Sequence, residues 1–134
     1  MSAIKKYPFA PGILFFLFTL FLFTLPGDAL PSSGWLKIPN KDKIVHYCLF
    51  FLVCHFFSLP VKYTSATKSA AFNWLVIISL LAIGYGIAIE FVQKWWIPNR
   101  SFELWDIVAD STGSIAAFVT NYMRFKRNNW WGKG

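Results

Sequence analysis

The sequence predicts an all-α integral membrane protein, a bundle of four transmembrane helices, for three reasons. Of the 134 residues, 56% are hydrophobic and only 14% are charged, which is far from the composition of an ordinary soluble domain. The mean hydropathy is positive, at +0.47. Four apolar runs, at about residues 9–25, 44–60, 72–93 and 102–122, each approach the roughly 17–25 residues with which a helix crosses a bilayer. The chain shows no internal repeat or linker, so we expect a single domain over residues 1–134.

The first run, FAPGILFFLFTLFLFTL, follows Lys5 and Lys6. The segment after it contains Gly27-Asp28-Ala29, which is similar to the small-x-small cleavage site of a signal peptide. The run is longer than the roughly 7–15 apolar residues that are common in signal peptides, so we expect a retained membrane helix. Cleavage of this segment stays open as the alternative.

The other three runs have features that are typical of helices packed in a membrane bundle. The second run contains the polar residues His46 and His55 and ends at Pro60. Glycine and alanine, which let helices approach closely, occur in the third and fourth runs. These small residues are Gly84, Gly86, Gly113, Ala116 and Ala117.

The distribution of charge predicts the orientation of the helices. The N-terminus, the middle loop and the C-terminus hold eight cations and no acid, whereas the other two loops and their helix ends hold five cations and all six acids. Because cationic loops stay on the cytoplasmic side, we expect both termini in the cytoplasm. The net charge of +7 then belongs to loops beside anionic lipid headgroups. We exclude nucleic acid as a partner, because the chain has too little polar sequence to form an exposed basic face.

Polar residues gather at the predicted outer ends of the last three runs. Asp42 and His46 are four residues apart and share a helical face, with Lys43 beside them. Glu90 and Gln93 share a face about one turn inside the third run. Ionisable residues within membrane spans usually face the bundle interior and have a function.

The fourth run continues this pattern, and Arg100 lies in the short loop before it. Glu103, Asp106, Asp110 and Gly113 follow at i, i+3, i+7 and i+10, which makes a polar stripe on one face of a helix. Glu103, in the first turn, is expected to interact with the helix dipole. We expect one polar pocket, open to the outer side, that is lined by Asp42, Lys43, His46, Glu90, Gln93, Arg100, Asp106 and Asp110.

A purely structural interpretation of these residues is also open. Lys43, Arg100, Glu90 and Asp106 would then pair as an ion network that ties three helix ends together. A functional pocket is the interpretation we prefer, because acids outnumber nearby cations and a histidine is present. His55, in mid-span with no acid nearby, is expected to be a hydrogen-bonded structural residue.

The same residues carry a resemblance to a known family, over roughly residues 36–121. Four motifs occur in order: Asp42-Lys43-Ile44-Val45-His46, Glu90-Phe91-Val92-Gln93, Arg100-Ser101-Phe102-Glu103-Leu104-Trp105-Asp106 and Asp110-Ser111-Thr112-Gly113. In these motifs the chain resembles the VanZ-like family of small bacterial membrane proteins, in which asparagine is more usual at the position of Asp110. The resemblance implies a multi-pass protein of the bacterial cytoplasmic membrane and a link to resistance against the lipoglycopeptide antibiotic teicoplanin. It implies no reaction.

Three functions are compatible with such a pocket. The first is binding or modulation of a lipid-linked cell-envelope precursor or a lipoglycopeptide, with the acyl chain held among the helices and membrane lipids around them. The second is an intramembrane hydrolase or transferase with a divalent metal as cofactor, for which His46, Glu90, Asp106 and Asp110 offer nitrogen and oxygen ligands. The third is transport, ranked last because no acid approaches the middle of a span. The sequence leaves open the ligand, the metal, the oligomeric state and whether the protein is an enzyme.

Overall fold

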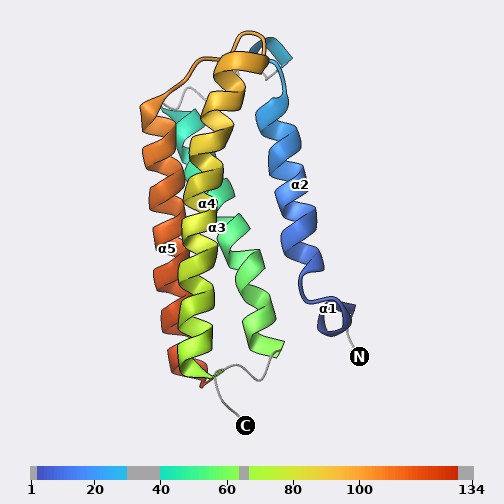
Figure 1. The fold of residues 1–134 in the computed structure, drawn as a ribbon, viewed down its shortest axis with the longest axis vertical. Helices are drawn as coiled ribbons and strands as arrows, with labels where there is room; N and C mark the ends of the chain where they lie inside the picture. Colours follow the sequence, from blue (N-terminus) through green and yellow to red (C-terminus); the bar gives the residue numbers. More distant parts are fainter. Residues whose placement is uncertain (1–2, 30–39, 64–66, 130–134) are drawn as a thin grey trace.

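The computed structural model describes residues 3–29, 40–63 and 67–129, and the regular structure in these ranges is helical. Its elements are α1 (Ala3–Lys6), α2 (Ala10–Thr24), the 3-10 helix η1 (Gly27–Ala29), α3 (Lys41–Tyr63), α4 (Lys68–Trp96) and α5 (Leu104–Asn128) (Figure 1). No strand occurs in the described ranges, so the prediction of an all-α fold is confirmed.

Helices α2 to α5 overlap the four apolar runs along most of their length. Helix α3 continues for about one turn beyond Pro60, because a proline near a helix end removes only one backbone hydrogen bond. By length and composition, α3 and α4 are apolar and long enough to cross a membrane. Helix α2 is apolar but has 15 residues, and α5 is not among the helices that meet both conditions. The structure therefore supports two of the four predicted spans on these grounds.

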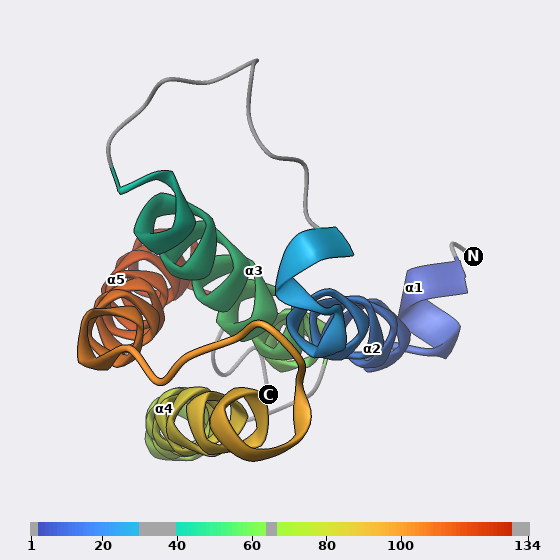
Figure 2. The same cartoon turned by 90° about the horizontal axis from the view of Figure 1, so that it is seen from above.

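Helix α3 lies at the centre of the bundle. It packs most extensively against α5 and also contacts α2 and α4, while α4 packs against α5. Seen from above, α2 and α5 lie on opposite sides of α3, and α4 covers a third side (Figure 2). Helix α2 contacts α4 much less than it contacts α3, so α2 forms one edge of the bundle.

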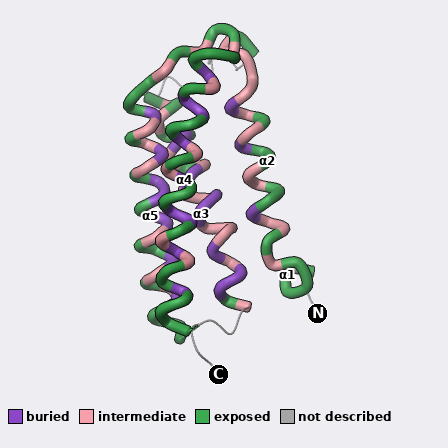
Figure 3. Tube along the Cα trace, viewed as in Figure 1, coloured by how far each residue is buried: buried purple, intermediate pink, exposed green. Residues whose placement is uncertain are grey.

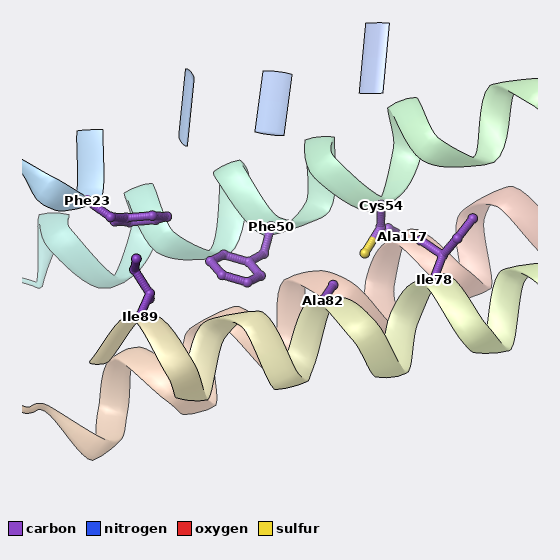
Figure 4. Packing of buried hydrophobic residues seen from close by; sticks show 7 residues of the cluster. All are labelled: Phe23, Phe50, Cys54, Ile78, Ala82, Ile89 and Ala117. Atoms are coloured by element: carbon purple, nitrogen blue, oxygen red, sulfur yellow. The ribbon is translucent and has the colours of Figure 1, made fainter. Parts of the chain in front are cut away.

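Two clusters of buried apolar side chains hold the helices together. The larger cluster joins α2, α3, α4 and α5 through Phe23, Phe50, Cys54, Ile78, Ala82, Ile89 and Ala117 (Figure 4). The smaller cluster lies where α3 and α5 end and α4 begins, and consists of Val61, Ala71, Leu75 and Phe125. Buried and exposed positions alternate along each long helix, so each has an inner and an outer face (Figure 3).

Two of the predicted small residues lie where helices approach closely. A Cβ added at Gly113 of α5 would clash with the backbone of Tyr47 in α3, and one at Gly86 of α4 would lie 2.7 Å from a carboxylate oxygen of Asp110. An added Cβ at Gly84 would have nothing within 4 Å, so the expectation is not met there. Ala117 is fully buried, and Ala116 is half-buried.

The end of α2 is fixed to the connection between α4 and α5. The backbone N–H of Gly27 donates a hydrogen bond to the carbonyl oxygen of Pro98, with 3.1 Å between the atoms. A Cβ added at Gly27 would clash with the backbone of Asn99. The segment that resembles a cleavage site thus packs onto the bundle, and α2 contributes Phe23 to the larger apolar cluster.

Candidate functional site

Polar side chains from α3, α4 and α5 meet inside the bundle at the end where α3 and α5 begin and α4 ends, which is the upper end in Figure 1. They are His46, Glu90, Asp106 and Asp110, called the polar site below, and none of them is more than 6% exposed. Buried carboxylates are unfavourable unless they are paired, protonated or bound to a cation. The contacts of each side chain therefore indicate what the site can bind.

His46 is held in place by Asp110. The imidazole Nδ1 of His46 lies 2.9 Å from Oδ1 of Asp110. When Asp110 is ionised, its carboxylate only accepts hydrogen bonds, and Nδ1 of His46 then carries a proton and donates it. In the neutral imidazole the other ring nitrogen, Nε2, then has a free lone pair, and it lies 3.8 Å from Oδ2 of Asp106. Asp110 thus fixes both the tautomer and the orientation of His46.

Lys43 balances part of the negative charge from the rim of the site. Its Nζ lies 3.0 Å from Oδ1 of Asp106, 2.5 Å from Oε2 of Glu103 and 2.6 Å from Oδ2 of Asp42. The contact with Asp106 is an ion pair by distance, yet Oδ1 has no partner with hydrogen-bond geometry, so we treat it as charge attraction alone. The side chains of Asp42 and Glu103 are about half-exposed, which places Lys43 at the boundary of the site.

Glu90 is completely buried, and only one of its oxygens is satisfied. Oε2 accepts a hydrogen bond from the backbone N–H of Glu103, the N-cap residue of α5, at 2.9 Å. In the described part of the chain, Oε1 of Glu90 and Oδ2 of Asp110 have no hydrogen-bond partner. Buried acceptors without a donor are rare in folded proteins. The polar site therefore has free capacity for hydrogen-bond donors or a cation.

Two residues expected in the pocket contact α2 instead. Nε2 of Gln93 donates to the carbonyl oxygen of Phe23 at 3.0 Å, and Nε of Arg100 donates to that of Leu25 at 3.3 Å. Among the described residues, Arg100 has no ion pair with Glu90 or Asp106, so the expectation that Arg100 lines the pocket or joins an ion network there is corrected. The last carbonyl groups of a helix have no hydrogen-bond partner within the helix. Because the loop that carries Arg100 passes the end of α2, Arg100 can donate to a carbonyl group there.

Asp42 also lies outside the polar site. It is an exposed residue paired with Lys43, so the face that it shares with His46 reaches from the rim to the interior. Glu103, expected to interact with the helix dipole, is the N-cap residue of α5, but its side chain forms no capping hydrogen bond and pairs with Lys43 instead.

His55 belongs to a second polar contact, deeper in the bundle. Its Nδ1 lies 2.9 Å from Oδ1 of Asn121, whose Nδ2 lies 3.4 Å from Oγ of Ser58. This geometry is that of a hydrogen-bonded structural residue, as expected from the sequence. Asn121 was not predicted, although its distance of eleven residues from Asp110, about three helical turns, places both on one face.

An apolar groove runs between α2, α3 and α4 and reaches toward the polar site. Its volume is about 370 Å³, and its lining includes Phe16, Val53, Phe57, Ile78, Leu81 and Tyr85. Tyr85 stacks on Phe50 with 5.4 Å between ring centroids, and the next residue, Gly86, faces Asp110. The sequence does not predict this groove, because the groove depends on the distance between α2 and α4.

Comparison with known proteins identifies a relative. The chain is similar to "Uncharacterized protein C11E3.10" of the fission yeast Schizosaccharomyces pombe, with 30% identity over 125 residues that make up 93% of this chain and 68% of the yeast protein. This chain belongs to the family of the yeast protein. No family model matches the chain, and no solved structure matches it.

These findings correct the resemblance drawn from the four motifs. No family model matches, and the relative is eukaryotic, so the chain is not assigned to the VanZ-like family. A bacterial source, a bacterial membrane and antibiotic resistance have no support either. Spacings such as Asp-x-x-x-His and Glu-x-x-Gln place two polar groups on one helical face, which any buried polar cluster requires, so they are poor evidence for a particular family.

Proposed function

We propose that the chain is a multi-pass membrane protein that binds a membrane amphiphile. In this proposal α2, α3, α4 and α5 all cross the bilayer, and both termini are cytoplasmic. The polar site, at the opposite end of the bundle, takes the polar head of the amphiphile, and the groove between α2 and α4 takes its hydrocarbon chain. The main support is that one bundle holds both unpaired buried acceptors and a large apolar groove, and that Gly86, which faces Asp110, directly follows the groove residue Tyr85.

The surfaces of α2 and α5 support four spans. Each turns polar residues inward, such as Thr19 of α2 and Asp110 of α5. The exposed apolar side chains are Ile13, Leu14, Leu17, Phe18 and Phe21 on α2 and Leu104, Val108, Ile115, Val119 and Met123 on α5. So much apolar surface is unfavourable in water, whereas in lipid polar groups belong inside the bundle. With 25 residues, α5 is roughly 38 Å long and can span the hydrocarbon layer.

Helix α2 is the shortest proposed span. Its 15 residues give about 22 Å, which is less than the roughly 30 Å of the hydrocarbon layer. A short span is accommodated by local thinning of the bilayer or by flanking residues that reach the interface. Lys5, Lys6 and Tyr7 precede α2 and are exposed, as expected for such flanking residues.

The size and lining of the groove suit a hydrocarbon chain. Its volume of about 370 Å³ falls within the roughly 300–1,000 Å³ of small-molecule sites. No charged residue is among its described lining residues, so a charged ligand would lose hydration without gaining an ion pair there. Tyr85 lies at the end of the groove that is nearer the polar site, and its hydroxyl is 3.3 Å from Oγ1 of Thr19. A single amphiphile can therefore use both features.

Lipid retention tests this proposal. The chain, purified in mild detergent with a chelator, is expected to retain one lipid in native mass spectrometry. Ala82→Phe would place a ring in the groove, because Ala82 is one of its lining residues, and retention should fall at least tenfold. Ala88→Phe makes the same change at an exposed position of α4 and should retain the lipid. Equal retention by both variants, or no lipid on the unmodified chain, would refute the proposal.

A second candidate function is hydrolysis or group transfer on the same amphiphile, assisted by a divalent metal. One observation favours it: His46, Glu90 and Asp106 each offer one ligand atom, and these atoms lie within 4.8 Å of one another. A metal-bound water is a nucleophile at neutral pH. Release of a cleaved head or chain from the retained lipid, seen only when metal is present, would separate this candidate from simple binding.

A further inference from the structure

We propose that the polar site is a resident site for a divalent first-row transition-metal ion. The ligands are Nε2 of His46 and one carboxylate oxygen each from Glu90 and Asp106, while Asp110 orients His46. The inference deepens the proposed function, because it rests on the same polar site being a binding site. Metal binding requires no lipid, so the metal site and the proposed amphiphile binding can be refuted separately.

The first argument is the geometry of the three ligands. They come from three helices, α3, α4 and α5, and are buried. Two donors that bind one ion at about 2.1 Å each can lie at most about 4.2 Å apart. The 3.8 Å between Nε2 of His46 and Oδ2 of Asp106 meets this limit. Since no pair in the set exceeds 4.8 Å, the widest pair has to close by at most about 0.6 Å to meet this limit, and by at most about 1.4 Å to reach the roughly 3.4 Å between ligands of a tetrahedral site.

The second argument is the unpaired oxygen of Glu90. Glu90 is 0% exposed, and its Oε1 has no hydrogen-bond partner among the described residues. Its other oxygen is held by the N–H of Glu103, which fixes the carboxylate and leaves Oε1 without a partner. Burial of such an atom costs free energy that coordination to a cation would offset.

The third argument is the role of Asp110. A histidine that binds a metal usually donates its other N–H to a carboxylate or a carbonyl group, which fixes the tautomer and makes the ligand more basic. Asp110 accepts this bond from Nδ1 of His46 at 2.9 Å and is itself fully buried. The arrangement of carboxylate, histidine and free Nε2 is therefore already present.

Lys43 does not replace the ion. It contacts Oδ1 of Asp106, whereas the oxygen that faces His46 is Oδ2. It is also shared with Asp42 and Glu103, and among the described ion pairs neither Glu90 nor Asp110 pairs with a lysine or an arginine. The group of Asp42, Glu103 and Asp106 is a weaker alternative, because two of its members are partly exposed and Lys43 already contacts all three.

Zn²⁺ and Mn²⁺ are the probes, since imidazole nitrogen and carboxylate oxygen suit both ions. The full chain is purified in mild detergent without a polyhistidine tag, stripped with a chelator and titrated with each ion. We expect about one ion per chain by elemental mass spectrometry and a rise in the melting temperature. His46→Gln and Asp106→Asn should abolish stoichiometric binding, and Asp110→Asn should weaken it by about 10–100-fold.

Two control variants make the test specific. His55→Gln alters the other histidine of α3, which bonds to Asn121, and Asp28→Asn removes an exposed acid outside the site. Both should bind the ion as the unmodified chain does. The inference is overturned if the unmodified chain binds neither ion, or if His46→Gln binds metal as well as His55→Gln does. The test on the unmodified chain does not depend on whether any variant folds.

Discussion

Gly86 of α4 lies directly against the carboxylate of Asp110 in α5. A Cβ at position 86 would be 2.7 Å from Oδ2 and 3.0 Å from the Cβ of Asp110. The missing side chain therefore makes room for a buried acid, and that acid orients His46. Close packing of α4 on α5 and the chemistry of the polar site depend on the same glycine.

Gly86→Ala should consequently destabilise the protein. The added methyl group forces the carboxylate of Asp110 to move, and overpacking of this kind costs about 1–3 kcal/mol. Gly84→Ala is the matched control, because an added Cβ there meets nothing within 4 Å. Unfolding in detergent, followed by circular dichroism, measures both. Equal stability of the two variants would show that α4 and α5 do not approach as described.

Gln93→Leu should loosen α2 without unfolding the other helices. Gln93 is 1% exposed, and its amide satisfies the carbonyl oxygen of Phe23 in the last turn of α2. Loss of this donor leaves a carbonyl without its partner, at a cost of about 1–3 kcal/mol. Hydrogen exchange should accelerate in α2 and stay unchanged in α5. Asn73→Leu, the same kind of change at an exposed position of α4, should leave exchange in α2 unaltered.

The fold class and most of the polar site could be predicted from the sequence because both depend on periodicity within single helices. The i, i+3 and i+7 spacing placed Asp106 and Asp110 on one face of α5, and the structure shows both buried. The same periodicity predicted that His46 and Glu90 lie on the inner faces of their own helices, and both are buried.

Two residues whose partners lie at the end of α2 could not be placed. Gln93 was assigned to the pocket because it shares a helical face with Glu90, and Arg100 because it lies in the short loop nearby. Their side chains instead donate to the carbonyl oxygens of Phe23 and Leu25, at the end of α2. Which face of α2 meets which loop depends on contacts between residues that are about 70 positions apart in the sequence. Helix α2 is almost uniformly apolar, so its sequence has no pattern that indicates this face. The groove between α2 and α4 was missed for the same reason.

The His55 contact predicts a stabilising polar pair within the bundle. Asn121 is 2% exposed, so His55→Ala leaves its buried amide oxygen Oδ1 without its partner. We expect a loss of about 1–3 kcal/mol in the free energy of unfolding. The double variant His55→Phe with Asn121→Leu should recover much of this loss, because no polar group is then left unpaired. Additive losses in the double variant would contradict the pairing.

Accessibility of engineered cysteines tests the proposed orientation. Ser69 at the start of α4 and Ser101 after its end are both exposed and allow the same Ser→Cys change. With Cys48 and Cys54 replaced, we expect an impermeant maleimide to label position 101, but not position 69, in sealed cells. Lysed cells provide the control in which both are labelled. Labelling of both positions from one side would mean that α4 does not span the membrane, and the reverse pattern would invert the topology.

Glu90→Gln separates the stability of the polar site from its ability to bind. Three buried carboxylates repel one another, so neutralising one should leave the free energy of unfolding unchanged or raise it by up to about 2 kcal/mol. The glutamine oxygen can still accept the N–H of Glu103, which Oε2 accepts now. Metal binding should nevertheless fall at least 100-fold, because an amide is a poor ligand for these ions.

Asp28→Asn, which neutralises an exposed acid outside the polar site, should change neither the free energy of unfolding nor metal binding. Unfolding in metal-free detergent and metal titration on the same preparations give both readouts. A clear loss of stability in Glu90→Gln would mean that the carboxylate serves to hold the helix ends together, and the polar site would then be a structural network.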